Sequence, residues 1–149
     1  MKKTLLSMAF AFAALATGGL NAAEVTDVLT ADGLGLGSGY SNFSSKSFTS
    51  EAVYAGNAMK GEKENLGAIQ LRSKSSNSGI VTTASGGTLK KITLSWTEGT
   101  SDARIVDVYG SNEPYNQATD LYSNSTRGEL IGSLQKGETE LVVEGDYQY

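Results

Sequence analysis

The chain has 149 residues and a mass of 15.6 kDa, enough for one domain, and its formal net charge is −4. An acidic chain without clustered lysine and arginine is not expected to bind nucleic acid, because that binding depends on neutralising phosphates. Histidine and cysteine are both absent, which excludes serine–histidine and cysteine–histidine nucleophiles, zinc sites built from histidine or cysteine, and disulfide bonds.

The first 23 residues have the pattern of an export signal. Two lysines near the start precede an apolar run of 12 residues, Leu5–Ala16, which is shorter than the about 20 residues that span a bilayer. Small residues in Leu20–Ala23 suit cleavage. We therefore predict a signal peptide at 1–23 and a mature domain at 24–149. The mature domain, with net charge −6, is expected to be secreted, periplasmic or on the cell surface, without membrane insertion. The alternative is a buried N-terminal helix.

The mature chain begins with a weak strand pattern over Val25–Thr30. The next stretch, Ala31–Ser50, is rich in glycine, serine and aromatic residues and is predicted to form an irregular loop over the sheet. Its aromatic residues Tyr40, Phe43 and Phe48 are interpreted as anchors of that loop rather than as platforms for a ligand.

Alternation of apolar and polar residues then indicates half-buried strands. It is clearest in Thr88–Trp96, where Ile92, Leu94 and Trp96 share one face opposite threonine and serine, so Trp96 is assigned to the core. Ala103–Gly110 repeats the pattern, with valines inward and Tyr109 outward. Shorter or weaker strands are predicted at Leu66–Ser73, Gly79–Thr83, Glu129–Leu134 and Thr139–Glu144.

Tight turns with glycine or asparagine separate these runs, and no stretch of the mature chain keeps a helical apolar stripe over three turns. Short strands joined in this way form antiparallel sheets. The sequence therefore predicts an all-β fold: an antiparallel β-sandwich, jelly-roll-like, preceded by a signal peptide.

Several motifs occur in the order found in a known β-sandwich module: Thr26–Thr30, Ala52–Gly56, Ile69–Ser73, Ser78–Thr83, Lys90–Thr93, Val108–Gly110 and Ala118–Tyr122. On these motifs the chain resembles an accessory module of secreted and cell-surface proteins of gut Bacteroidota, which occurs alone or beside nucleases, Ig-like repeats and glycan-degrading enzymes. The resemblance covers nearly the whole mature chain. It implies the sandwich fold and, by analogy of fold with carbohydrate-binding jelly rolls, a direction for function.

The resemblance also implies a further strand beyond Tyr147–Tyr149. We therefore expect 24–149 to lack its last strand as a C-terminal truncation. The last strand of a jelly roll commonly pairs beside the first, so its absence would leave Val25–Thr30 with an open edge. The purified mature chain is accordingly predicted to aggregate, and a monodisperse monomer with a cooperative melt would refute this.

Candidate sugar-binding residues lie in two loops. Tyr115 follows the single proline, between Asn112 and Asn116, and combines an aromatic ring with planar amides, the chemistry that sugars need. Arg72 and Asn77 form a second candidate after the strand that ends near residue 71. The alternatives are a loop tyrosine packed on the sandwich and an arginine tied to loop carbonyls or acids.

Enzymatic chemistry has only carboxylates to draw on. Glu62 and Glu64, and a second group formed by Glu138, Glu140, Glu144 and Asp146, are interpreted as solvated acids rather than as a glycosidase pair. No cofactor is expected. A structural calcium ion is a minor alternative near Asp102, Asp107 and Asp120, without a recognisable calcium loop.

The sequence thus predicts a non-catalytic exported β-sandwich module that binds carbohydrate or mediates adhesion at a surface, with a glycan or another surface protein as partner. The main alternative is a structural or protein-interaction domain without a small-molecule ligand. A carboxylate glycosidase is a remote third.

Overall fold

The computed structural model describes residues 6–15 and 23–149. These residues form ten strands and two short 3-10 helices, so the predicted all-β class is confirmed. The strand predicted at Thr88–Trp96 is found with the same limits, and the other predicted strands are found with limits shifted by a few residues. Within the described residues no helix is long and apolar enough to cross a membrane.

A large antiparallel sheet contains eight of the strands. Its order is β10-β7-β1-β5-β4-β3, with β2 added beside β1 and β6 beside β4. The bounds are β1 (Leu6–Leu15), β2 (Glu24–Leu29), β3 (Ser41–Ser47), β4 (Val53–Lys60), β5 (Ile69–Leu71), β6 (Gly79–Ala84), β7 (Thr88–Trp96) and β10 (Glu140–Val142). A separate antiparallel pair is formed by β8 (Ile105–Gly110) and β9 (Glu129–Gln135). The 3-10 helices are η1 (Lys63–Asn65) and η2 (Ala118–Tyr122).

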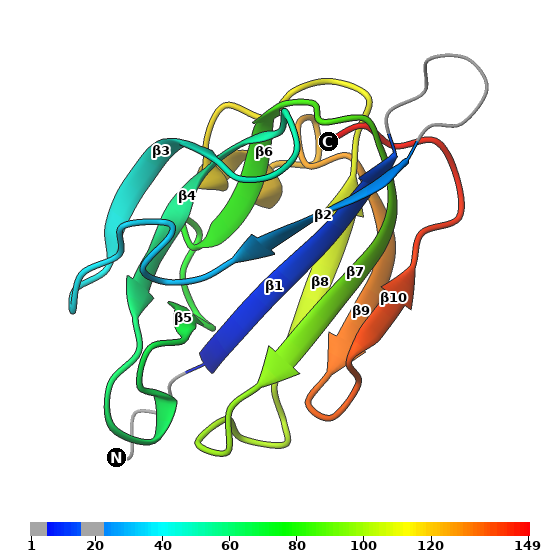
Figure 1. Cartoon of the computed structure of the whole chain (residues 1–149). Coiled ribbons are helices and arrows are strands. Elements are labelled where there is room, and N and C mark those ends of the chain that lie inside the picture. Colours follow the sequence, from blue (N-terminus) through cyan, green and yellow to red (C-terminus); the bar gives the residue numbers. More distant parts are fainter. Residues whose placement is uncertain (1–5, 16–22) are drawn as a thin grey trace.

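The core lies between these two layers. In Figure 1, β8 and β9 lie behind β1 and β7, and buried residues of both layers belong to one apolar cluster. Ile92 and Leu94 of β7 are 2% exposed, while Val106, Val108 and Leu134 close the cluster from β8 and β9. The two-residue alternation therefore identified the inward faces of β7 and β8 correctly.

Trp96, at the end of β7, is half-buried and packs against this cluster, as predicted. Its indole Nε1 donates a hydrogen bond to the carbonyl of Glu138 at 2.6 Å. The ring therefore serves packing, and its polar atom ties β7 to the turn before β10.

The prediction of an irregular loop over 31–50 is wrong for Ser41–Ser47, which forms β3 and pairs with β4. Alternation could not reveal this strand, because Phe43 is its one fully buried residue in a run of serines and other polar side chains. The strand is irregular: Ser45 has a φ of 56°, and the register shifts between Phe43 and Lys46, as in a β-bulge.

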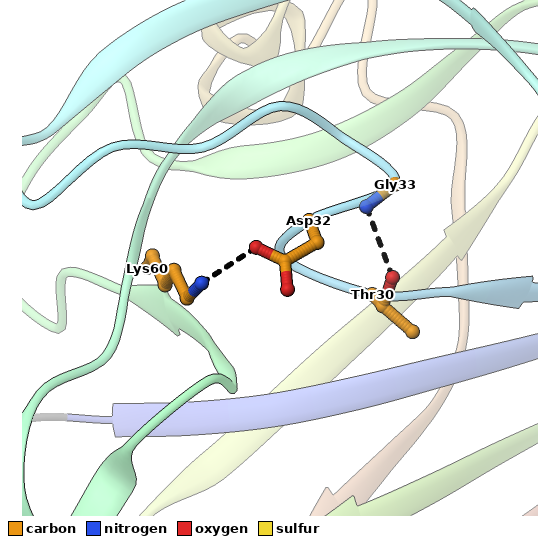
Figure 2. Close-up of polar contacts among 4 residues, drawn as sticks. All are labelled: Thr30, Asp32, Gly33 and Lys60. Carbon is orange, nitrogen blue, oxygen red and sulfur yellow. Dashed lines mark hydrogen bonds and ion pairs between the residues drawn. The ribbon is translucent and has the colours of Figure 1, made fainter.

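A compact turn after β2 places Leu34 in the core with no exposed surface. Figure 2 shows how it is held: the Gly33 amide donates to Thr30 Oγ1 at 3.0 Å, and Lys60 Nζ lies 2.6 Å from Asp32 Oδ1. The ion pair joins the turn to the end of β4 on the outside of the molecule, where the Asp32 side chain is 78% exposed.

Strand β1 lies inside the predicted export signal. It pairs antiparallel with β7 along one edge and with β2 and β5 along the other, so the alternative of an N-terminal helix is wrong for Leu6–Leu15. The rest of the predicted signal, apart from Ala23, lies outside the described residues. Cleavage after Ala23 stays a prediction, and it would remove β1 from the sheet.

Candidate ligand-binding cleft

A cleft of about 630 Å³ lies between β6 and β8. Within the described part of the chain, β6 pairs only with β4 and β8 only with β9, so the cleft lies between two strands that do not pair with each other. Its volume is in the range of pockets that bind small ligands. Its walls come from Gly79–Thr82, Ala103–Tyr109, the loop after β5, the η2 region and the last two residues.

All three arginines of the chain line this cleft. Arg72 comes from the end of β5, Arg104 from the residue before β8, and Arg127 from the loop before β9. The one acidic side chain among the described lining residues is Asp107, and it accepts a hydrogen bond from Ser133 at 2.6 Å. A chain of net charge −4 therefore gathers its guanidinium groups in one concave place.

The Arg72 side chain is held by Tyr40, the residue before β3, and by Asn57 of β4. Its guanidinium carbon lies 4.4 Å from the centre of the Tyr40 ring, and Nη2 donates to Asn57 Oδ1 at 3.0 Å. Tyr40 is itself fixed, because its hydroxyl accepts a hydrogen bond from Gln70 Nε2 at 2.8 Å. The Arg72 Nε atom is buried without a hydrogen-bond partner. Stacking and one amide thus orient the guanidinium without a carboxylate to neutralise it.

Tyr115 is a packed ring in this structure. It is 4% exposed, belongs to a small apolar cluster with Ala55 and Val81, and its hydroxyl donates to the carbonyl of Arg127 at 2.7 Å. The alternative interpretation, a loop tyrosine packed on the sandwich, therefore describes it better than an exposed stacking platform does. Through that hydrogen bond Tyr115 positions the loop that carries Arg127.

Burial raises the pKa of Tyr115 to about 12, with a further contribution from the negative charge of Asp120. A tyrosine whose pKa is higher in the folded chain contributes stability that is complete below pH 10 and is lost as the pH rises through about 12. We therefore expect the free energy of unfolding to fall between pH 10 and 12 by about 2 kcal/mol more in the wild type than in Tyr115→Phe. Urea titrations at several pH values measure this, and parallel curves would contradict it.

Four further tyrosines line the cleft: Tyr54, Tyr109, Tyr122 and Tyr149. Arg127 lies over the ring of Tyr109, with its guanidinium carbon 5.4 Å from the ring centre. Tyr122 is 45% exposed, and its hydroxyl donates to the carbonyl of Ser78 at 2.5 Å. Burial of the hydroxyl raises the pKa of Tyr122 above its ordinary value. Tyr109 is less buried than Val106 and Val108, although all three residues line the cleft, so its predicted outward orientation stays a prediction.

The five predicted site residues are not brought together. Arg72 and Tyr115 line the arginine cleft, whereas Asn77 and Asn116 line a second hollow of about 260 Å³. The side chain of Asn77 accepts a short hydrogen bond from Ser75, and the backbone amide of Asn116 donates to Asp120 at 2.7 Å.

The fifth predicted residue, Asn112, is exposed in the loop before Tyr115 and lies outside both hollows. Sequence reasoning missed Arg104, Arg127 and Tyr122, which carry no local motif. The sequence showed only that an acidic chain contains three arginines, which made each of them a possible site for an anion. Their convergence depends on pairing between distant segments.

A buried polar cluster lies beside the cleft floor. Asp27 of β2 is 1% exposed and accepts hydrogen bonds from the Ser50 amide at 2.6 Å, the Ser50 hydroxyl at 2.5 Å and the Tyr54 hydroxyl at 2.8 Å. Burial, reinforced by the bond to Asp27, raises the pKa of Tyr54 far above its ordinary value. The cluster therefore keeps Tyr54 protonated and links β2, the segment before β4 and β4 itself.

The acids considered for glycosidase chemistry lie elsewhere. Glu140 pairs with Lys91 at 3.3 Å, and Glu138 accepts a hydrogen bond from the Gln135 amide at 2.6 Å. Neither glutamate lines the cleft.

The three aspartates considered as calcium ligands have different surroundings. Asp107 bonds Ser133, Asp120 caps η2 through the amides of Asn116 and Gln117, and Asp102 is exposed. Among the described residues no group of three or more acidic side chains is placed to hold a metal ion.

Comparisons with protein-family models, with curated proteins and with solved structures find no match to this chain.

Proposed function

We propose that this chain is a non-catalytic exported β-sandwich module that binds an anionic glycan, one that carries carboxylate or sulfate groups, in the cleft between β6 and β8. One observation carries the proposal: all three arginines and five tyrosines line a single cleft, and its described lining residues include one acidic side chain. Its exported location and its relation to the surface modules of gut Bacteroidota are part of the same proposal and rest on the sequence patterns.

The chemistry of the lining supports an acidic sugar. A guanidinium group offers paired N–H donors that match the oxygens of a carboxylate or sulfate. Tyrosine rings offer apolar faces to a sugar ring and hydroxyls to its edge. A neutral sugar would gain nothing from the positive charge gathered in the cleft.

Arg127→Gln tests the proposal. The substitution keeps the backbone carbonyl that Tyr115 bonds but removes a guanidinium from the cleft. A hydrogen bond to a charged group contributes about 1.5–3 kcal/mol, so we expect an affinity loss of roughly tenfold or more for uronate- or sulfate-bearing oligosaccharides. Isothermal titration calorimetry on the full chain measures it.

Lys74→Gln is the matched control, because Lys74 is an exposed cation nearby that does not line the cleft. It should change the affinity less than twofold. Equal affinities of Arg127→Gln and the wild type, or equal binding of neutral and acidic oligosaccharides, would contradict the proposal.

The alternative, a structural or protein-interaction domain, is favoured by a different feature. Several large apolar side chains remain more than half exposed on the strands: Val28, Ile105, Leu130 and Val142. Exposed apolar residues on strands mark surfaces that other polypeptides can cover. No retention of any glycan at millimolar concentration would leave this alternative ahead.

A further inference from the structure

Strand β1 closes the large sheet at its centre. Its register with β7 runs from Met8 opposite Trp96 to Leu15 opposite Thr88. Its other edge pairs with β2 and, nearer its start, with β5. Figure 1 shows β1 between β2 and β7 along most of its length. The strand is thus antiparallel to every neighbour and bonded on both sides.

Two of these neighbours depend on it. Among the described residues β2 has no strand partner other than β1. Strand β7 would keep only β10, which pairs with it over the short stretch Lys91–Thr93. Without β1, the sheet would hold two facing edges of unpaired backbone groups, separated by the width of one strand. Such edges readily pair with another strand.

The gap between β2 and β7 also favours a particular pattern of side chains in the strand that fills it. The register places Phe10 opposite Leu94 and Phe12 opposite Ile92, and both β7 residues are 2% exposed in the closed sheet. On the other edge Met8 is opposite Ile69, which has no exposed surface. Removing the strand would leave these residues of β7 and β5 on an unpaired strand edge. A strand that fits carries large apolar residues at alternate positions, with small residues between them, as Leu6–Leu15 does.

We propose that the position of β1 is a strand-acceptor site: after export removes residues 1–23, it binds an extended apolar segment of another polypeptide, antiparallel to both β2 and β7. Main-chain hydrogen bonds to two edges would provide affinity, and the alternate apolar positions would provide specificity. Each described strand other than β1 already pairs within the fold, so the donor in this proposal is a segment of a separate polypeptide. Leu71, Leu89 and Ile92, which lie opposite β1 in the register, also line the arginine cleft, so the acceptor site borders the cleft; strand binding itself needs no glycan.

The test begins with the full chain exported from a bacterial host and identified by mass. The probe is a fluorescent synthetic peptide of residues 6–15, and the control peptide carries Phe10→Asp and Phe12→Asp. We expect the processed chain to bind the probe one to one, with a higher melting temperature, and to bind the control peptide at least tenfold more weakly. A chain in which Ala23→Arg blocks cleavage should not bind the probe, because its own β1 occupies the site.

Several results would overturn the proposal. These are recovery of the exported chain with residues 1–23 still attached, a processed chain that melts cooperatively without binding the probe, and equal binding by the processed and the cleavage-blocked chains. If the processed chain aggregates by itself, it is refolded from urea with either peptide. The probe should then yield soluble chain and the control peptide should not, and equal aggregation with both would also overturn the proposal.

Discussion

Asp27→Ala is expected to lower the free energy of unfolding by about 4 kcal/mol, because it leaves two hydroxyls and one backbone amide without their acceptor, each at a cost of about 1–3 kcal/mol. The Asp27 carboxylate has three hydrogen bonds, two from Ser50 and one from Tyr54, and it is 1% exposed. The substitution takes this acceptor away from all three donors and opens a small cavity. For a domain of this size the melting temperature should fall by roughly 10 °C.

Asp32→Ala is the matched control. It removes the same side chain from the next turn, where Asp32 pairs with Lys60 but is 78% exposed. Exposed ion pairs contribute less than about 1 kcal/mol, so this variant should melt within a few degrees of the wild type. Equal destabilisation by the two substitutions would show that the buried cluster has no special role.

A double-mutant cycle identifies the partner. Tyr54→Phe removes the hydroxyl that Asp27 accepts, so it should cost stability in the wild type and less in the Asp27→Ala background. The expected coupling is about 1 kcal/mol or more, measured by urea denaturation. Additive effects would mean that the hydrogen bond between the two side chains contributes nothing measurable.

Sequence periodicity predicted the strands that have one face in water. β7 alternates in burial at Ile92, Thr93 and Leu94, and its limits were predicted correctly. β4 could not be found from alternation, because six consecutive residues from Tyr54 to Met59 are buried. Tyr54 and Ala58 belong to the main apolar cluster, whereas Ala55 belongs to the small cluster with Val81 and Tyr115, so both faces of β4 are covered.

The candidate site was less predictable than the fold. Arg72 and Tyr115 were identified from the sequence of their own loops, but the residues that they contact lie far from them along the chain. Tyr40 stacks on Arg72 from 32 residues before it, and Arg127 follows Tyr115 by 12 residues. The burial of Asp27 was not predicted either, because an acidic residue in a short strand is ordinarily exposed to solvent. Only the pairing of β2 within the sheet turns it inward beside Leu29.

Gly56→Ala is expected to lower the free energy of unfolding by about 3 kcal/mol, at the upper end of the usual cost of overpacking. Gly56 lies in β4, opposite Phe43 of β3 and Ile80 of β6. A Cβ atom there would stand 2.2 Å from the carbonyl oxygen of Gly79 and 2.8 Å from the Phe43 ring. The ring can rotate, but the carbonyl belongs to the backbone of β6, so β4 and β6 must move apart.

Gly37→Ala is the matched control, because a Cβ atom at Gly37 meets nothing within 4 Å. It should leave the melting temperature almost unchanged or raise it slightly, since alanine restricts the unfolded chain more than glycine does. If Gly56→Ala melted like Gly37→Ala, the close packing of β4 against β6 would be wrong. Because β6 forms one wall of the arginine cleft, the displacement caused by Gly56→Ala should also weaken glycan binding, whereas Gly37→Ala should not affect it.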